Sequence, residues 1–123
     1  MSPGSFQNLV QSSVLDIRFV RRRPRASRPP TRRMLCTLNS EILLSVNGRT
    51  VLNYLPPANN LPYTISDKGL VMVWDILMQN FRMVSSESVN VLEKYTPGEE
   101  FWNHFNTNIR TMDGRAKQSF MNS

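Results

Sequence analysis

The clearest periodic pattern in the sequence lies between Ser66 and Val84. Its apolar side chains recur three or four residues apart, whereas the charged and amide side chains fall largely on the opposite face. A helix over 67–84 is therefore expected, with Gly69 in its first turn at a small cost in stability. Its apolar face consists of Leu70, Val73, Trp74, Leu77, Phe81 and Val84.

A second helix is expected over 97–112, where the pattern opens with a start signal. Thr96 can cap the first turn, Pro97 occupies the first helical position, and Glu99 stands three residues after the cap, as in a capping box. The apolar stripe that follows is helical in its spacing. It consists of Phe101, Phe105, Ile109 and Met112.

Two shorter segments are rich in β-forming residues and predict strands. In residues 41–54 the dipeptide Asn47-Gly48 separates two such runs, and this dipeptide tolerates the positive φ of a two-residue hairpin turn. A β-hairpin is therefore expected at 41–54. Residues 88–95 alternate well enough to form one further strand.

The N-terminal residues 6–20 carry two competing patterns. Apolar side chains recur at helical spacing behind Ser5, a suitable N-cap. From Leu15 to Phe19, apolar and charged side chains alternate instead, as they do on a strand. We expect a helix in the first part of this segment, within residues 6–18.

The positive charge of the chain is concentrated near its N-terminus. The whole chain has a formal net charge of +6 and a pI near 10.3. Residues 1–33 hold eight arginines against the single acid Asp16, or +7, whereas residues 34–123 hold seven basic and eight acidic groups, or −1. Three prolines and the mutual repulsion of the arginines predict an extended, disordered segment over 21–33.

The expected organisation is one α+β domain preceded by a basic arm. The arm covers residues 1–33 and is disordered apart from its helix. A compact body with the hairpin, the further strand and the two helices covers 34–112. A flexible tail covers 113–123.

An arginine-rich arm of this kind predicts binding to nucleic acid. Guanidinium groups bind phosphate through two parallel hydrogen bonds and stay charged at any working pH. Neutralising several phosphates releases counterions and gives affinity with little sequence preference. We therefore expect a non-enzymatic structural or accessory protein that binds nucleic acid, such as a viral capsid protein, a nucleoprotein or a ribonucleoprotein subunit. RNA is the expected partner ahead of DNA, although no residue pattern in the arm distinguishes the two. The expected contact residues are Arg18, Arg21, Arg22, Arg23, Arg25, Arg28, Arg32 and Arg33.

Other interpretations of the arm stay open. Clustered basic residues also serve as a nuclear localisation signal. An Arg- and Ser-rich, acid-poor start with an amphipathic helix also fits a presequence that is cleaved after import into mitochondria or plastids. The body would then be a small subunit of a larger complex. A solvated tail that meets an acidic membrane surface is a further alternative.

The body is expected to form homo-oligomers or to join a larger assembly. Its aromatic side chains are more numerous than a small core hides easily. Tyr54 lies at the end of the predicted hairpin. Trp102 is displaced by about 100° from the apolar stripe of its helix, at the rim of the core. Tyr54 and Trp102 are therefore the candidate interface residues.

No motif in the sequence points to an enzyme, a metal site or a cofactor. Cys36 is the only cysteine and His104 the only histidine, so the chain cannot build a cysteine-based or histidine-rich metal site by itself. A solvated or capping role is expected for His104. With neither an apolar run of membrane-spanning length nor a secretory signal, a reducing compartment is expected, either the cytoplasm or nucleus of a host cell, or an organelle matrix.

Overall fold

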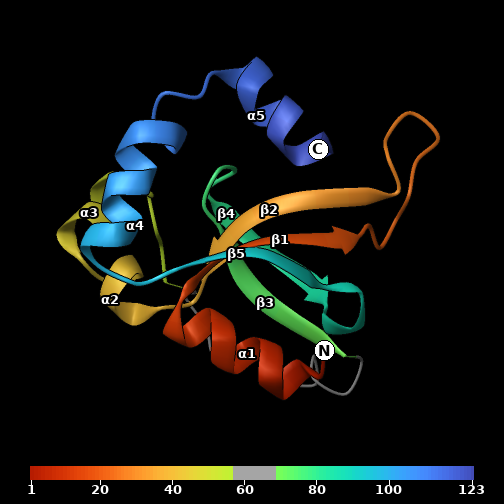
Figure 1. The fold of residues 1–123 in the computed structure, drawn as a ribbon, viewed down its shortest axis with the longest axis horizontal. Helices are drawn as coiled ribbons and strands as arrows, with labels where there is room; N and C mark the ends of the chain where they lie inside the picture. Colours follow the sequence, from red (N-terminus) through yellow and green to blue (C-terminus); the bar gives the residue numbers. More distant parts are fainter. Residues whose placement is uncertain (57–68) are drawn as a thin grey trace.

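A computed structural model describes residues 1–56 and 69–123. In these residues, five strands form one antiparallel sheet in the order β4-β3-β2-β1-β5, with helices packed against it (Figure 1). The α+β class expected from the sequence is confirmed. The strands are β1 (Val14–Val20), β2 (Thr31–Thr37), β3 (Leu70–Asp75), β4 (Asn80–Ser85) and β5 (Asn90–Tyr95).

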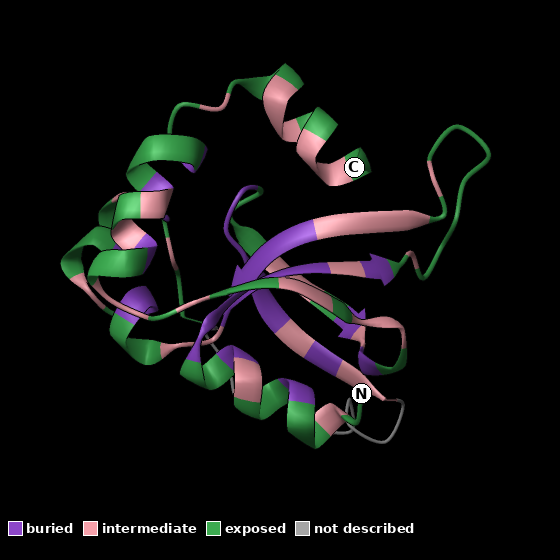
Figure 2. Ribbon diagram, in the orientation of Figure 1, coloured by how far each residue is buried: buried purple, intermediate pink, exposed green. Residues whose placement is uncertain are grey.

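Two apolar clusters lie on opposite faces of the sheet, and different helices cover them. Phe6 and Val10 of α1 are buried on one face, whereas Phe101, Phe105 and Ile109 are buried on the other. Figure 2 shows the buried positions along the strands and along the inner sides of these helices. The helices are α1 (Pro3–Ser12), α2 (Ser40–Leu43), α3 (Val46–Thr50), α4 (Glu99–His104) and α5 (Gly114–Asn122), with a 3-10 turn η2 (Ser86–Ser88) and a π-helical turn η3 (Phe105–Ile109).

The sheet is curled because its middle strands pair over a short distance. β2 and β3 are in register at two positions, Cys36 with Asp75 and Thr37 with Trp74. The β3–β4 hairpin therefore turns away from β1 and β2 and crosses them at an angle in Figure 1. Apolar side chains of β3 and β4 join those of β1 and β2 in the cluster beneath α1.

The N-terminal segment forms a helix and then a strand, so each of its two sequence patterns corresponds to one element. Ser2 is the N-cap of α1 in place of the expected Ser5, since Ser2 Oγ accepts a hydrogen bond from the Ser5 backbone N–H (3.1 Å). The helix ends at Ser12 and does not continue to residue 18, because residues 14–20 form β1. β1 lies between β2 and β5, so the apolar alternation is buried in the middle of the sheet.

The structure gives the arginine-rich segment a different place from the expected disordered arm. Residues 21–30 form the loop that joins β1 to β2. β2 begins at Thr31, which places Arg32 and Arg33 inside the sheet. The three prolines all fall in the loop, where no ladder hydrogen bond is required of them. Residues 1–20 thus contribute a helix and an interior strand to the folded domain.

The hairpin expected at 41–54 is wrong. The segment contains two short helices, α2 and α3, whose first turns are capped by the side chains of Asn39 and Ser45. Gly48 lies inside α3 and does not adopt the positive φ of a hairpin turn. A Cβ atom on Gly48 would lie 2.2 and 2.5 Å from backbone carbonyl oxygens of α2. This glycine therefore permits the close approach of two helices.

The helix expected over 67–84 is also wrong for the described residues from 69 onward, and its first two residues lie outside them. Those residues form the β3–β4 hairpin. The side chains that recur at helical spacing point to opposite faces of the sheet. Val73 and Val84 lie in the cluster beneath α1, whereas Trp74 and Leu77 lie in the cluster on the opposite face. β-Branched and aromatic residues suit a buried strand, and tertiary packing decided between helix and strand.

The β3–β4 turn has its own local signals. Asp75 Oδ1 accepts a hydrogen bond from the Met78 backbone N–H (3.1 Å), and Gln79 adopts a positive φ of 55°. An aspartate that bonds to the backbone a few residues onward is a common turn initiator. The expected position of Asp75 on the outer face of a helix is therefore corrected to the first position of a tight turn.

The helix expected over 97–112 is present as α4 followed by η3, but its start differs. Gly98, with a φ of 110°, occupies the N-cap position. The carboxylate that reaches back to the Thr96 backbone N–H is that of Glu100 (2.5 Å), not that of Glu99. The N-cap therefore lies two residues after the predicted one, and the helix begins at Glu99.

The strand expected at 88–95 is confirmed by β5, whereas the C-terminal segment differs from expectation. Residues 113–123 were expected to form a flexible tail but contain α5. Asp113 caps this helix by accepting a hydrogen bond from the Ala116 backbone N–H (2.8 Å). Figure 1 shows α5 beside β2, against which it packs.

Replacing Gly48 with alanine is expected to lower the free energy of unfolding by about 1–3 kcal/mol. The added Cβ would collide with the carbonyl oxygens of Ile42 and Leu43. Gly4→Ala in α1 is the matched control, since nothing lies within 4 Å of its Cβ position and alanine favours a helix. Urea unfolding followed by circular dichroism compares the two, and equal stability would contradict the close approach at Gly48.

Candidate nucleic-acid interface

The loop between β1 and β2 carries arginines that face solvent. Arg22, Arg23, Arg25 and Arg28 are exposed, and their guanidinium groups form no ion pair with other described residues. The loop sequence contains no acidic residue that could neutralise them. These four of the eight predicted arginines are therefore free to bind phosphate. We call residues 21–30 the arginine loop.

The two arginines at the start of β2 instead pair with buried aspartates. Arg32 Nη2 lies 2.5 Å from Asp75 Oδ2. Arg33 binds Asp16 through two parallel contacts, from Nε to Oδ1 (2.9 Å) and from Nη2 to Oδ2 (2.5 Å). Asp16 and Asp75 are 4% and 1% exposed. Each arginine therefore compensates a carboxylate whose burial alone would be costly.

Arginines from both hairpins line one open cleft. Arg21, Arg28 and Arg32 meet Arg82 of β4 around a cavity of about 290 Å³. A second hollow of about 180 Å³ has the same four arginines in its lining, together with further residues of the arginine loop. None of the described residues that line either hollow is acidic. We call the two hollows together the arginine cleft.

Arg82 was missed by reasoning from the sequence. It is far from the arginine run along the chain and lies in a segment that was expected to be a helix. The curl of the sheet brings β4 beside the base of the arginine loop, and no local pattern around Arg82 signals this contact. The cleft is therefore a product of tertiary structure.

The electrostatics of the cleft are those of crowded positive charges. Burial lowers the pKa of the Arg21 guanidinium, and the nearby charges of Arg32 and Arg28 lower the pKa further. Arginine nevertheless stays protonated at any working pH. An anion in the cleft would relieve this repulsion, which favours phosphate as a ligand.

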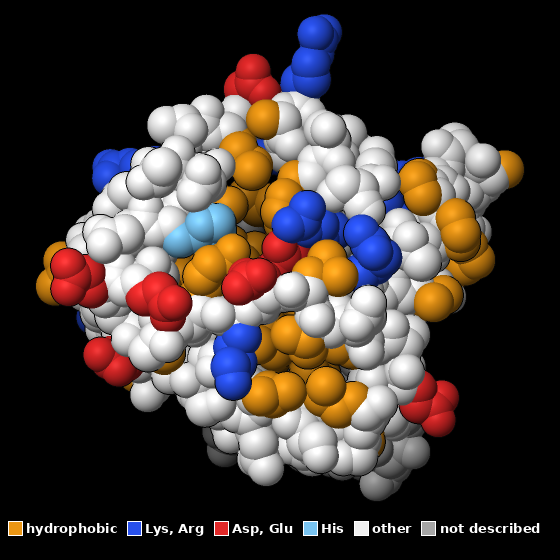
Figure 3. Space-filling view, in the orientation of Figure 1, with side chains coloured by type: hydrophobic (Ala, Val, Ile, Leu, Met, Phe, Trp, Pro, Cys, Tyr) orange, Lys and Arg blue, Asp and Glu red, His pale blue; other side chains and the backbone are white. Residues whose placement is uncertain are grey.

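Helix α5 occupies part of the same basic surface. Its last residues contact Arg18, Arg21 and Arg33, so these predicted arginines are partly engaged within the fold. On the face seen in Figure 3, Lys and Arg side chains gather over β1 and β2, below α5, next to acidic and hydrophobic groups. The contacts run from Arg18 Nη2 to the Ser123 carbonyl oxygen (3.1 Å), from Arg21 Nη2 to Asn122 Oδ1 (3.1 Å), and from the Arg33 guanidinium to the Phe120 ring centroid (4.3 Å).

The two candidate interface residues both pack against the domain. Tyr54 follows α3 and lies edge-on to Trp74 and Phe81, with ring centroids 5.1 and 5.9 Å away. Trp102 is half-buried at the rim of its cluster, 4.8 Å from Phe101. The structure does not bring these two residues together with the arginines. Their role in an interface stays a prediction.

His104 and Cys36 are both held within the fold. The His104 ring stacks on Tyr95, with centroids 4.2 Å apart, and its Nδ1 lies 3.1 Å from Asn108 Nδ2. Cys36 is fully buried, and burial raises the pKa of its thiol. In residues 1–56 and 69–123, no group of three or more His, Cys, Asp or Glu side chains could hold a metal ion. None of the helices in the same residues has the length and apolar character needed to cross a bilayer.

Comparison with known protein families, curated proteins and solved structures gives no match to this chain. Its function must therefore be inferred from the chemistry of its own surfaces. In the part of the chain that the structure describes, the arginine loop and the arginine cleft together contain seven arginines and no acidic residue.

Replacing Asp75 with alanine is expected to lower the free energy of unfolding by about 3–5 kcal/mol, because Arg32 is then without its partner in a mostly buried position. Asp75 also accepts the hydrogen bond that starts the β3–β4 turn. A double-mutant cycle separates the two contributions. Arg32→Ala combined with Asp75→Ala should cost less than the sum of the single changes in urea unfolding. Strict additivity would contradict a stabilising ion pair.

The stability of the fold is expected to fall as the pH drops from about 7.5 to about 5.5. Burial lowers the pKa of His104 in the folded chain, against smaller upward effects of Asp16 and Glu93. The unfolded chain therefore binds the proton first as the pH falls, and this favours unfolding. His104→Gln should flatten this part of a stability–pH curve measured by urea unfolding. An unchanged slope in the variant would contradict the assignment to His104.

Proposed function

We propose that this chain is a non-enzymatic nucleic-acid-binding protein, structural or accessory, that holds a phosphate backbone with its arginine loop and arginine cleft. One observation carries the proposal. Arg21, Arg28 and Arg32 from one hairpin meet Arg82 from another around one open cleft whose described lining contains no acid. Only Arg32 of the four has an ion-pair partner among the described residues, so the cleft keeps an excess of positive charge. An extended polyanion would neutralise that excess.

The side chains of this surface favour contacts to the phosphate backbone of a nucleic acid rather than to its bases. The arginine loop extends the cleft with exposed guanidinium groups, which match the geometry of phosphate. Phe19 is the single aromatic residue among the described residues that line the cleft, and it is buried. A platform for base stacking would need exposed aromatic rings. Binding is therefore expected to depend strongly on salt and weakly on sequence. We propose RNA ahead of DNA as the partner.

The position of the N-terminal segment supports its retention in the working protein. Cleavage after Arg33 would remove α1, β1 and the start of β2, and β1 pairs with both β2 and β5. Such a cleavage would leave β5 without the strand that it pairs with. The alternative of a cleaved presequence for organelle import therefore fits the structure poorly. The proposal places the protein in the cytoplasm or nucleus, as a homo-oligomer or a subunit of a nucleic-acid-containing assembly.

The first test is binding of a mixed-sequence single-stranded RNA, measured by fluorescence anisotropy over a range of salt concentrations. The variant Arg22→Ala/Arg23→Ala/Arg25→Ala/Arg28→Ala removes the exposed charges of the arginine loop. It should weaken binding and reduce the slope of log K against log salt by about 0.7 for each phosphate that the variant no longer neutralises. A DNA strand of the same sequence tests the preference for RNA.

A charge-matched control shows whether position matters. The variant Arg49→Ala/Lys94→Ala/Arg110→Ala/Arg115→Ala also removes four positive charges, all from exposed positions outside the cleft. It should retain most of the affinity and the salt slope. Equal decreases in the two variants would reduce the effect to net charge alone, and wild-type protein without salt-dependent binding would refute the proposed function.

A further inference from the structure

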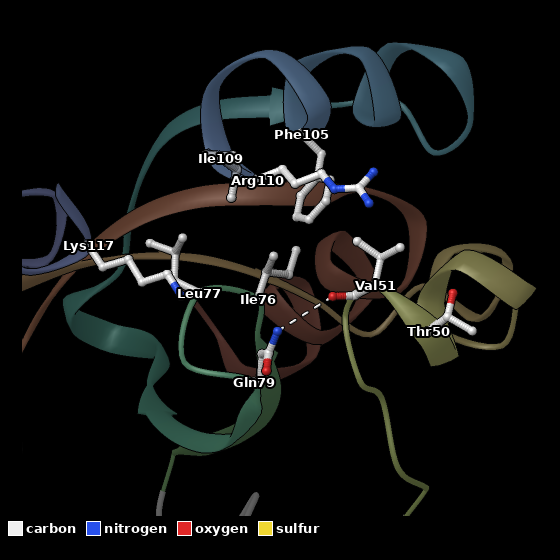
Figure 4. Close-up of a pocket in the computed structure, with 9 residues that line it drawn as sticks. All are labelled: Thr50, Val51, Ile76, Leu77, Gln79, Phe105, Ile109, Arg110 and Lys117. Carbon is white, nitrogen blue, oxygen red and sulfur yellow. Dashed lines mark hydrogen bonds between the residues drawn. The ribbon is translucent and has the colours of Figure 1, made fainter. Parts of the chain in front are cut away.

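A second pocket lies away from the arginine loop, between α3, the β3–β4 turn and η3. It has a volume of about 250 Å³. Figure 4 shows the Phe105 ring pointing from η3 into this space, with Ile76 beneath it and Gln79 on its lower side. Gln79 Nε2 donates a weak hydrogen bond to the Val51 carbonyl oxygen (3.5 Å), which ties the turn to the end of α3. The apolar part of the lining is Val51, Ile76, Leu77, Phe105 and Ile109.

The π-helical turn shapes this pocket. The Arg110 backbone N–H donates to the Phe105 carbonyl oxygen (2.8 Å), five residues earlier. This wider turn ends one residue before Arg110 and gives both its first and last residues, Phe105 and Ile109, to the lining. Single π-turns are rare and are found frequently at functional sites. The backbone geometry therefore points to this pocket independently of its shape.

Two cations line the pocket, and neither forms an ion pair within the part of the chain that the structure describes. Arg110 of the lining makes one long contact, from Nη1 to Asn106 Oδ1 (3.5 Å), within its own helical segment. Lys117 of α5 is the second cation. The two ion pairs in the described residues involve other side chains, and no described lining residue is acidic. A ligand with a carboxylate beside an apolar group could bind the two cations with the carboxylate and contact the apolar part of the lining with the other group.

The volume of the pocket decides what kind of ligand fits. Pockets that enclose a whole drug-sized ligand or cofactor have volumes of roughly 300–1,000 Å³. A pocket of about 250 Å³ that is open to solvent suits one large side chain of a partner. We propose that it is a docking site for an acidic segment of a partner protein, in which one aromatic or aliphatic side chain enters the pocket and neighbouring carboxylates bind Arg110 and Lys117.

This site is distinct from the proposed nucleic-acid surface. α5 contributes Lys117 to the pocket, whereas its residues Gln118 and Met121 line the arginine cleft. The partner would bind next to the nucleic acid and through different side chains. The inference stands on the pocket alone and does not require the proposed function to be correct.

The test uses the full chain and a synthetic acidic peptide, acetyl-Glu-Asp-Phe-Asp-Glu-amide, followed by amide chemical shifts in NMR. Binding with a Kd of about 1 mM or tighter is expected, with the largest shifts at Leu77, Gln79, Ile109 and Arg110. Replacing the peptide's Phe with Ala should abolish those shifts. Replacing its acids with Lys should abolish binding altogether.

Charge reversal in the protein identifies the cations. Arg110→Glu/Lys117→Glu should weaken binding of the Phe peptide by about tenfold or more. Lys94→Glu/Arg115→Glu, at two exposed positions outside the pocket lining, is the charge-matched control and should leave Kd within about twofold. Equal binding of the Phe and Ala peptides, shifts centred on the arginine cleft, or no shifts at millimolar peptide would overturn the proposal. Binding of 3-phenylpropionate as tightly as the peptide would overturn it in favour of a small-molecule site.

Discussion

Two ion pairs between β2 and buried aspartates hold the arginine-rich hairpin in its place. Arg33 binds Asp16 on β1, and Arg32 binds Asp75 on β3. A carboxylate buried without a partner would be strongly unfavourable, so the strands must pair in a way that brings each arginine within reach of its aspartate. The pairs link three neighbouring strands of the sheet, β1, β2 and β3. Together with the β1–β2 ladder, which continues to the hydrogen bond from the Arg21 backbone N–H to the Pro30 carbonyl oxygen (2.9 Å), this anchoring holds the base of the arginine loop.

The same anchoring divides the arginines into two groups with different roles. Arg32 and Arg33 are largely neutralised by their partners and hold the base of the hairpin. The arginines of the loop have no such partners among the described residues and keep their charge available to solvent. One arginine-rich run of the sequence thus supplies both the ion pairs that anchor the β1–β2 hairpin and the exposed charges of the loop at its end. Repulsion in the tip is tolerable because it is exposed, where solvent screens the charges.

Helix α5 borders both of the surfaces to which we assign binding. It covers part of the basic face through Phe120 and the residues that follow, and it supplies Lys117 to the pocket beneath η3. None of its residues is fully buried, although Phe120 packs against the cluster that contains Phe101 and Phe105. Polar and cation–π contacts join the end of this segment to Arg18, Arg21 and Arg33. The C-terminal segment therefore contributes to both of the surfaces that we propose for binding.

The sequence by itself determined the features that depend on local chemistry. The α+β class, the strand at 88–95, a helix after Pro97 and the concentration of arginines all follow from composition and spacing over short stretches. The four exposed loop arginines of the candidate site were predicted in the same way, and their binding role stays a prediction. Asn47-Gly48 misled because glycine was required by the approach of α2 to α3, and a dipeptide does not reveal which of its neighbours in space will be close.

Tertiary structure alone decided which residues far apart in the chain come together. The spacing from Val73 to Val84 fits one helical face as well as two faces of a hairpin, and burial on both sides of a curled sheet selected the hairpin. Because residues 70–85 form this hairpin, Asp75 lies beside Arg32, and Arg82 is the fourth arginine that lines the arginine cleft. Local patterns set the preferences of each segment, but charge pairing and apolar burial act across the whole fold, and their outcome is defined only when the strands have paired.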